Sequence, residues 1–173
     1  IAGLALERGK ITEQDVPLLV IAAGGHDLFY DPKRKGHNEK RSAEITIDMI
    51  KPFTCFEPEH VRDVGKLVMA TTVKSFFPRL IQSVDPADYR TGIIADADLF
   101  SFGMPFPEFK PRAFAYLDEL VETNQQRLMQ YLDGECVLLE NHQWHTAEAA
   151  ELFPHVVENV DAVRGLQTVY AIQ

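Results

Sequence analysis

The sequence predicts an all-α protein with a single domain over residues 1–173. Apolar residues recur at helical spacing in one segment after another, and capping residues, prolines and glycines divide these segments into helices. Apolar and polar residues do not alternate with a period of two over any useful length, except at residues 136–139. The chain is 46% hydrophobic and 25% charged, which is typical of a globular domain that can bury a proper core.

Start and stop signals place the boundaries of the expected helices. We expect helices over residues 1–8, 12–26, 38–51, 58–70, 85–102, 111–130 and 146–163. Thr12 and Asn38 have the side chains that cap helix N-termini, and Pro58 suits the first turn of a helix. Gly9 and Pro52 end the helices that precede them.

The C-terminal part of the chain follows the same rules. Asp85 opens a capping segment for a helix that stops at Gly103, and Thr146 caps the last helix. Residues 31–36 are a loop by their proline, glycine and charge content, and residues 76–78 break the helical pattern. Both interruptions are expected boundaries between successive helices of one domain.

Charge and cysteine usage restrict the class of partner. The formal net charge of −9 disfavours a general nucleic-acid binder, because such proteins are usually basic. Cys55 and Cys136 are the only cysteines, which fits two reduced thiols in a cytoplasmic protein and not a disulfide framework. No apolar run is long enough to span a bilayer, so we expect no membrane partner.

His26 and Asp27 form the first candidate site, since they follow the apolar run 16–23. An imidazole nitrogen and a carboxylate oxygen together suit a borderline divalent metal such as iron, manganese, zinc or nickel. Adjacent helical residues point about 100° apart, so other segments must complete such a site. The alternative is a local hydrogen bond between the two side chains.

A second candidate lies in the apolar segment 91–103, which contains Asp96 and Asp98. Residues two apart point to nearly opposite sides of a helix, so one carboxylate can face the core while the other faces water. A carboxylate among apolar residues needs a partner. The alternative is that both aspartates are solvated or cap a turn.

Three motifs follow one another along the chain: HDLFYDP at residues 26–32, NEKRSA at 38–43 and DADL at 96–99, the last followed by Gly103. Together they resemble the HD-domain metal-dependent phosphohydrolases, and most closely a bacterial branch of predicted enzymes in that superfamily. The resemblance covers most of the chain and weakens toward the C-terminus. It implies an HD-type helical bundle around one divalent metal ion, with Mn, Fe, Ni, Co, Zn and Mg as candidates.

The resemblance also implies roles for individual residues. His26, Asp27 and Asp98 would be the metal ligands, because the last ligand of the family follows a small residue and precedes a turn with leucine. Asp96 would then lie behind the ligands or face solvent. Glu39 and Asp27 are the expected catalytic residues, with Glu39 near the metal-bound water as a proton acceptor or hydrogen-bonding group. The other role for Glu39 is an acid in the first turn of a helix, where the dipole favours it.

The chain departs from the family pattern at two of its histidines. No histidine precedes His26, and Lys74 stands where related sequences often have a histidine. We therefore expect one metal ion and not two. Ile1 lies in what reads as a helix interior, so we expect an upstream segment that donates the missing first histidine.

The expected activity is the metal-dependent hydrolysis of a small phosphate ester, with nucleotides among the candidate substrates. Residues 33–35 are basic and either steer an anionic substrate or form a solvated loop. Two alternatives remain. One is a non-catalytic metal- or nucleotide-binding regulatory protein on the HD fold, and the other is an HD-fold di-iron oxygenase, against which Lys74 argues.

Overall fold

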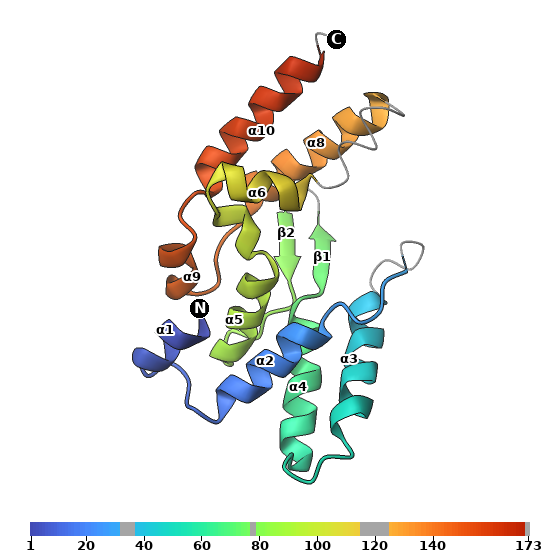
Figure 1. Ribbon diagram of the computed structural model, residues 1–173, viewed down its shortest axis with the longest axis vertical. Helices are drawn as coiled ribbons and strands as arrows, with labels where there is room; N and C mark the ends of the chain where they lie inside the picture. Colours follow the sequence, from blue (N-terminus) through green and yellow to red (C-terminus); the bar gives the residue numbers. More distant parts are fainter. Residues whose placement is uncertain (32–36, 77–78, 115–124, 172–173) are drawn as a thin grey trace. The chain divides into compact units, whose positions relative to one another are not determined.

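A computed structural model describes residues 1–31, 37–76, 79–114 and 125–171 of the chain (Figure 1). The all-α class is confirmed, because helices dominate and the strands in the described part form a single two-stranded hairpin. The helices are α1 (Ala2–Glu7), α2 (Asp15–Gly25), α3 (Asn38–Ile50), α4 (Pro58–Ala70), α5 (Tyr89–Asp98), the 3-10 helix η1 (Phe100–Gly103), α6 (Phe106–Ala113), α8 (Gln125–Asn141), α9 (Ala147–Leu152) and α10 (Val156–Ala171). The strands are β1 (Val73–Phe76) and β2 (Arg79–Gln82).

These elements gather into two compact units. The first unit comprises Ile1–Ser75, Ile81–Asp98 and Trp144–Ala149, and the second comprises Phe76–Leu80, Leu99–Gln143 and Ala150–Gln173. The single domain expected over residues 1–173 stays a prediction.

Helix α4 is the centre of the first unit, because it packs against α2, α3 and α5 (Figure 1). Its side chains Val64, Leu67 and Val68 are fully buried. Burying an aliphatic side chain of this size contributes about 1.5–3 kcal/mol to folding. Gly65 lets α3 approach closely, since a Cβ atom there would lie 2.6 Å from Ile47 Cδ1.

The N-terminal helix boundaries differ from the expected ones at both predicted caps. Thr12 is not the N-cap of α2: its hydroxyl and backbone N–H donate to Asp15 Oδ2 at 2.7 and 2.8 Å, and the helix begins at Asp15. Asn38 is the first residue of α3 and does not cap it. Its Oδ1 instead accepts a hydrogen bond from the backbone N–H of Asp31 at 3.0 Å. Other predicted signals are confirmed, since Gly9 ends α1 with φ of 66° and Pro58 starts α4.

The β hairpin was not predicted. Residues 136–139, the one place where a period of two was expected, lie in helix α8, so they do not form a strand. Each strand has only four residues, which is too short for a period-two pattern to stand out. A backbone hydrogen bond from Ser83 N–H to Thr72 O at 3.0 Å extends the pairing beyond the two strands.

The expected helices over 111–130 and 146–163 differ from the observed ones where the structure describes them. Pro111 lies inside α6, which ends at Ala113, α8 extends to Asn141, and residues 115–124 lie outside the described part of the chain. Pro154 separates α9 from α10, because proline has no N–H to donate and disfavours helical geometry in the residue before it. Thr146 does cap α9, since its Oγ1 accepts from Ala149 N–H at 3.2 Å.

The second unit is built on the packing of α8 against α10, with η1 and α6 against α10. Phe102, Phe109 and Phe114 form edge-to-face ring pairs, so the aromatic residues of this region pack into a core. Asn159 is fully buried, and its Nδ2 donates to the carbonyl oxygens of Phe102 and Met104 at 2.8 Å each. Within the described part of the chain, no helix combines the length and apolar character needed to cross a membrane.

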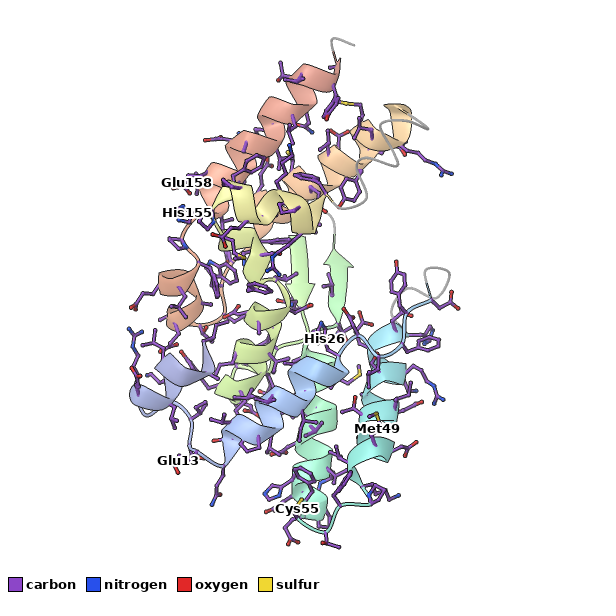
Figure 2. All side chains as sticks on the ribbon, in the orientation of Figure 1. Glu13, His26, Met49, Cys55, His155 and Glu158 are labelled. Carbon is purple, nitrogen blue, oxygen red and sulfur yellow. The ribbon has the colours of Figure 1, made fainter. Side chains whose placement is uncertain are left out.

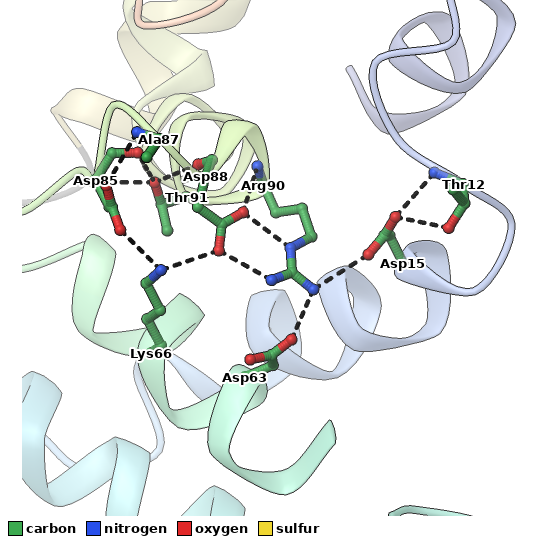
Figure 3. A network of polar contacts seen from close by, with 9 residues as sticks. All are labelled: Thr12, Asp15, Asp63, Lys66, Asp85, Ala87, Asp88, Arg90 and Thr91. Carbon is green, nitrogen blue, oxygen red and sulfur yellow. Dashed lines mark hydrogen bonds and ion pairs between the residues drawn. The ribbon is translucent and has the colours of Figure 1, made fainter. Parts of the chain in front are cut away.

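A network around Arg90 joins three helices of the first unit (Figure 3). The Arg90 guanidinium forms two hydrogen bonds with Asp88 at 2.9 Å, and it also contacts Asp15 at the start of α2 and Asp63 on α4, at 3.1 and 2.8 Å. Lys66 donates to Asp88 at 3.1 Å. The hydrogen bonds from Arg90 lower the pKa of Asp88 from 3.8 to about 2, against the effect of burial.

Asp96 joins α5 to the segment that returns at residues 144–149. Its carboxylate accepts three hydrogen bonds, from the backbone N–H groups of His145 and Thr146 at 2.8 Å each and from Thr146 Oγ1 at 2.6 Å. Of the two expected positions of Asp96, the one that faces solvent is wrong, because its side chain is fully buried. Burial raises the pKa of Asp96, and the three donors hold the carboxylate in place.

Replacing Asp96 by alanine is expected to reduce the free energy of unfolding by about 3 kcal/mol, because it leaves buried N–H groups without an acceptor. Urea denaturation at pH 7 measures this loss. Asp48 is exposed on α3 and provides the control, for which Asp48→Ala should cost less than about 0.5 kcal/mol. Equal losses for the two variants would contradict the role given to Asp96.

Replacing Arg90 by leucine is expected to destabilise the protein at pH 7 by roughly 2 kcal/mol, because Asp15, Asp63 and Asp88 lose the guanidinium group that they share. Since the pKa of Asp88 is lower in the folded state, its stabilising effect is complete above pH about 4 and is lost as the pH falls toward about 2. The difference between wild type and variant should therefore shrink by on the order of 1 kcal/mol over this range.

Urea denaturation at a series of pH values between 2 and 7 measures that difference. Arg41→Leu is the control, because Arg41 is exposed and pairs with the exposed Glu44, three residues further along α3, at 2.9 Å. A constant difference between wild type and Arg90→Leu over this pH range would show that Asp88 is not stabilised by Arg90.

Candidate metal centre

The apolar helix α2 delivers His26 to the site. Leu18, Leu19 and Ala22 are buried and fix α2 against the core of the first unit. The helix ends at Gly25, and His26 is the next residue (Figure 2). His26 therefore extends from a helix end whose position is set by packing.

Three predicted site residues meet at one ring nitrogen. His26 Nε2 lies 3.1 Å from Asp98 Oδ1 and 3.3 Å from Asp27 Oδ2. Asp98 is the last residue of α5, and α5 packs against α2. Asp98 thus faces His26, whereas Asp96 bonds to His145 and Thr146.

The other ring nitrogen of His26 fixes its tautomer. Nδ1 lies 2.8 Å from the carbonyl oxygen of Ala23, and a carbonyl oxygen can only accept, so Nδ1 carries the proton. Nε2 therefore faces two carboxylates with either a second proton or a bound cation. Without a cation, hydrogen bonding to Asp98 raises the pKa of His26 from 6.5 to about 9, against the effect of burial.

The two carboxylates differ in their contact with solvent. The side chains of His26 and Asp98 are 23% and 22% exposed, whereas that of Asp27 is 78% exposed. The site therefore has a fixed inner part, formed by His26 and Asp98, and an outer carboxylate on Asp27 that can move at little cost. Water and small solutes can reach the site from the side of Asp27.

Three polar side chains on α3 bind the backbone that carries the site, and we call Asn38, Ser42 and Thr46 the polar ladder. Asn38 Oδ1 accepts from Asp31 N–H at 3.0 Å, as described above. Ser42 Oγ accepts from Phe29 N–H at 3.0 Å and lies 3.4 Å from Phe29 O. Thr46 Oγ1 lies 3.2 Å from Gly25 O and 2.8 Å from Ser42 O. These residues were not predicted as part of the site, although their spacing of four places them on one face of a helix.

Gly25 allows α3 to approach this closely. A Cβ atom at position 25 would lie 2.3 Å from Thr46 Oγ1, so any residue larger than glycine would force Thr46 or the helices to shift. Gly25 is buried, and it precedes His26 directly. The glycine therefore serves a close contact between α2 and α3, one residue before the candidate ligand.

Glu39 lies in the first turn of α3, next to Asn38 in the sequence. Its Oε2 atom is buried, and the described residues supply no hydrogen bond to it. None of the contacts of His26 described above involves Glu39. A catalytic role for Glu39 and a role at the helix start both remain predictions.

Other polar residues have partners of their own, are exposed or lie outside the described part of the chain. Lys74 is an exposed residue of β1. His145 Nε2 lies 3.1 Å from Gln82 Oε1, and Glu148 accepts from Tyr89 and Arg8, so the histidine and the acid have different partners. The basic residues 33–35 lie outside the described part of the chain.

The donor set of the centre suits a divalent ion, although the donors are not yet gathered around one. Over the described ranges, no three His, Cys, Asp or Glu side chains already have the mutual arrangement of a metal site. His26, Asp27 and Asp98 nevertheless offer one nitrogen and two carboxylate oxygens, each oxygen within 3.3 Å of His26 Nε2, and the backbone bond of His26 Nδ1 is typical of a metal-binding histidine. Movement of the exposed Asp27 carboxylate would bring the three donors closer together.

Comparison of the chain with protein families, with curated proteins and with solved structures gives no match in any of the three. The class of site is therefore inferred from the residues and their geometry.

In metal-free protein at pH 7, Asp98→Ala is expected to lower the free energy of unfolding by about 1–2 kcal/mol, because it removes the closer and more buried partner of protonated His26. Asp27→Ala should cost less than about 0.5 kcal/mol, because an exposed ion pair contributes little. Urea denaturation in the presence of a chelator compares the two variants. A larger loss for Asp27→Ala would reverse the assignment of inner and outer carboxylates.

Proposed function

We propose that this protein is a metal-dependent phosphohydrolase of the HD type that acts on a small phosphate ester, with nucleotides among the candidate substrates. One observation carries the proposal: His26 Nε2 faces Asp98 at 3.1 Å and Asp27 at 3.3 Å, while Nδ1 is bound to a backbone carbonyl. The three residues are the ones that the HD resemblance assigns to the metal.

The chemistry of the donors supports this reading. An imidazole nitrogen together with carboxylate oxygens suits a divalent ion, and the candidates are Mn, Fe, Ni, Co, Zn and Mg. A divalent ion in such a site supplies a Lewis acid for a phosphoryl oxygen and lowers the pKa of bound water. With three protein donors, positions remain open for substrate and water.

The metal ligands and the proton acceptor would have different roles in the reaction. His26 and Asp98 hold fixed positions because both extend from packed helices, and Asp27 adjusts its exposed carboxylate to the ligand. Glu39 is the proposed proton acceptor, since its buried Oε2 has no hydrogen-bond donor among the described residues. Asp27 is the second proposed catalytic residue, because it lies on the solvent side of the centre.

A second candidate function is a non-catalytic protein that binds a metal or a nucleotide on the same fold. The exposure of Asp27 favours this candidate, because a ligand that is 78% exposed binds a cation less tightly than a buried one. The di-iron oxygenase is the weakest candidate, because Lys74 is an exposed lysine at the place where it would need a further histidine.

Titration calorimetry with Mn²⁺, followed by a panel of phosphate esters, tests the proposal. We expect one Mn²⁺ per chain and Mn²⁺-dependent release of phosphate. Asp98→Asn should weaken Mn²⁺ binding at least about tenfold, because it removes a charged donor while it keeps the shape of the side chain. Asp48→Asn removes an exposed carboxylate of the same unit and should leave Mn²⁺ affinity unchanged.

The outcomes separate the candidates. Mn²⁺ binding without turnover on any ester would support the non-catalytic protein. Two metal ions per chain would support the di-iron reading. An Asp98→Asn variant that binds Mn²⁺ as tightly as wild type would refute the proposed ligand set.

A further inference from the structure

We infer that the polar ladder of α3 positions the His26–Asp27 pair, so that Thr46 and Ser42 are positioning residues of the centre. This inference rests on the proposed function, because it assigns the ladder a role toward the metal. The ladder does not itself contact the three donors. It acts through the backbone of residues 25–31, from which two of them extend.

The end of a helix explains why this backbone needs partners. The last carbonyl groups of α2 have no N–H to accept from within the helix. Two of them bear directly on the site: Ala23 O accepts from His26 Nδ1 at 2.8 Å, and Gly25 O lies 3.2 Å from Thr46 Oγ1. The carbonyl that orients the imidazole and the carbonyl held by α3 are therefore two residues apart.

The ladder holds the segment beyond His26 as well as the helix end before it. Thr46 contacts Gly25, one residue before His26, and Ser42 contacts Phe29, two residues after Asp27. The pair is thus clamped on both sides. Ser42 and Thr46 are themselves buried, at 0% and 3% exposure, so water cannot easily replace their hydrogen bonds.

The close approach of Gly25 makes this arrangement specific. The close contact of Gly25 with Thr46 opposes a movement of α3 toward α2, and a movement away lengthens the 3.2 Å contact of Thr46 Oγ1 with Gly25 O, an acceptor that shares the Thr46 hydroxyl with Ser42 O at 2.8 Å. Asp98 comes from a third helix, α5, and lies 3.1 Å from His26 Nε2. The ladder therefore sets the distance of the His26–Asp27 pair from a donor on a different helix.

The test compares Thr46→Val, which removes the hydroxyl and keeps the volume, with Thr46→Ser, which keeps the hydroxyl. Thr91→Val is the matched control, because Thr91 is also buried and also donates to backbone carbonyls, at the start of α5 and away from Asp98. Ser42→Ala is a second variant that adds no volume. The full chain is used throughout, with Mn²⁺ alone as the probe.

Two quantities are measured, namely the affinity for Mn²⁺ by titration calorimetry and the ring nitrogen chemical shifts of His26 in metal-free protein. We expect Thr46→Val and Ser42→Ala to weaken Mn²⁺ binding about 10- to 100-fold and to move the His26 ring signals. Thr46→Ser should recover most of the affinity. Thr91→Val should destabilise the fold but leave both quantities within about twofold of wild type, which a merely structural role of Thr46 would not predict.

The two readouts distinguish failure of the inference from failure of the proposed function. If wild type binds Mn²⁺ and Thr46→Val binds it equally well, the positioning role is overturned while the metal site stands. If wild type does not bind Mn²⁺, the proposed metal site fails, and the His26 ring signals decide on the ladder. Signals that move in Thr46→Val and not in Thr91→Val support positioning, and unchanged signals in both overturn it.

Discussion

The end of α2 is the constraint on which the candidate centre depends. A helix that stops against a packed neighbour must satisfy its last carbonyl groups locally, because water has little access to them. Here the His26 ring binds one carbonyl, that of Ala23, whereas Gly25 O has two neighbours, Thr46 Oγ1 at 3.2 Å and the backbone N–H of Leu28 at 3.4 Å. The contacts that end the helix therefore also set the tautomer of the imidazole and its distance from α3. A change that weakens the end of α2 is expected to alter the geometry of the centre as well.

The first unit also shows how an acidic chain accommodates clustered carboxylates. Asp15, Asp63 and Asp88 share the guanidinium of Arg90, and the buried Asp96 is held by backbone and hydroxyl donors. His26 is the shared partner of the remaining pair. At the Arg90 cluster the cation is part of the chain. At His26 a second proton on the imidazole, or the proposed metal ion, takes that place.

Much of the fold, and part of the centre, could be predicted from the sequence. Helical spacing and proline signals are local, so α1, α3 and α4 were found close to their observed bounds. The choice of Asp98 over Asp96 to face His26 followed from a family pattern. The polar ladder, the hairpin and the break at Pro154 were missed. The ladder depends on partners distant in sequence and the hairpin on strands too short to show a period, neither of which local spacing reveals. The break at Pro154, in contrast, is a local effect of the proline itself.

The buried carboxylate of Asp96 has a consequence for how the chain reaches its native state. Its donors are 49 and 50 residues away in sequence, and Arg8 meets Glu148 across 140 residues. The first unit therefore contains contacts of high sequence separation although it is made of helices, and such contacts slow folding because a long loop must close before they form. During synthesis the helices before residue 98 emerge long before residues 144–149. Until then Asp96 lacks its hydrogen-bond donors at residues 145 and 146, and the first unit, which holds His26 and Asp98, cannot complete its native packing.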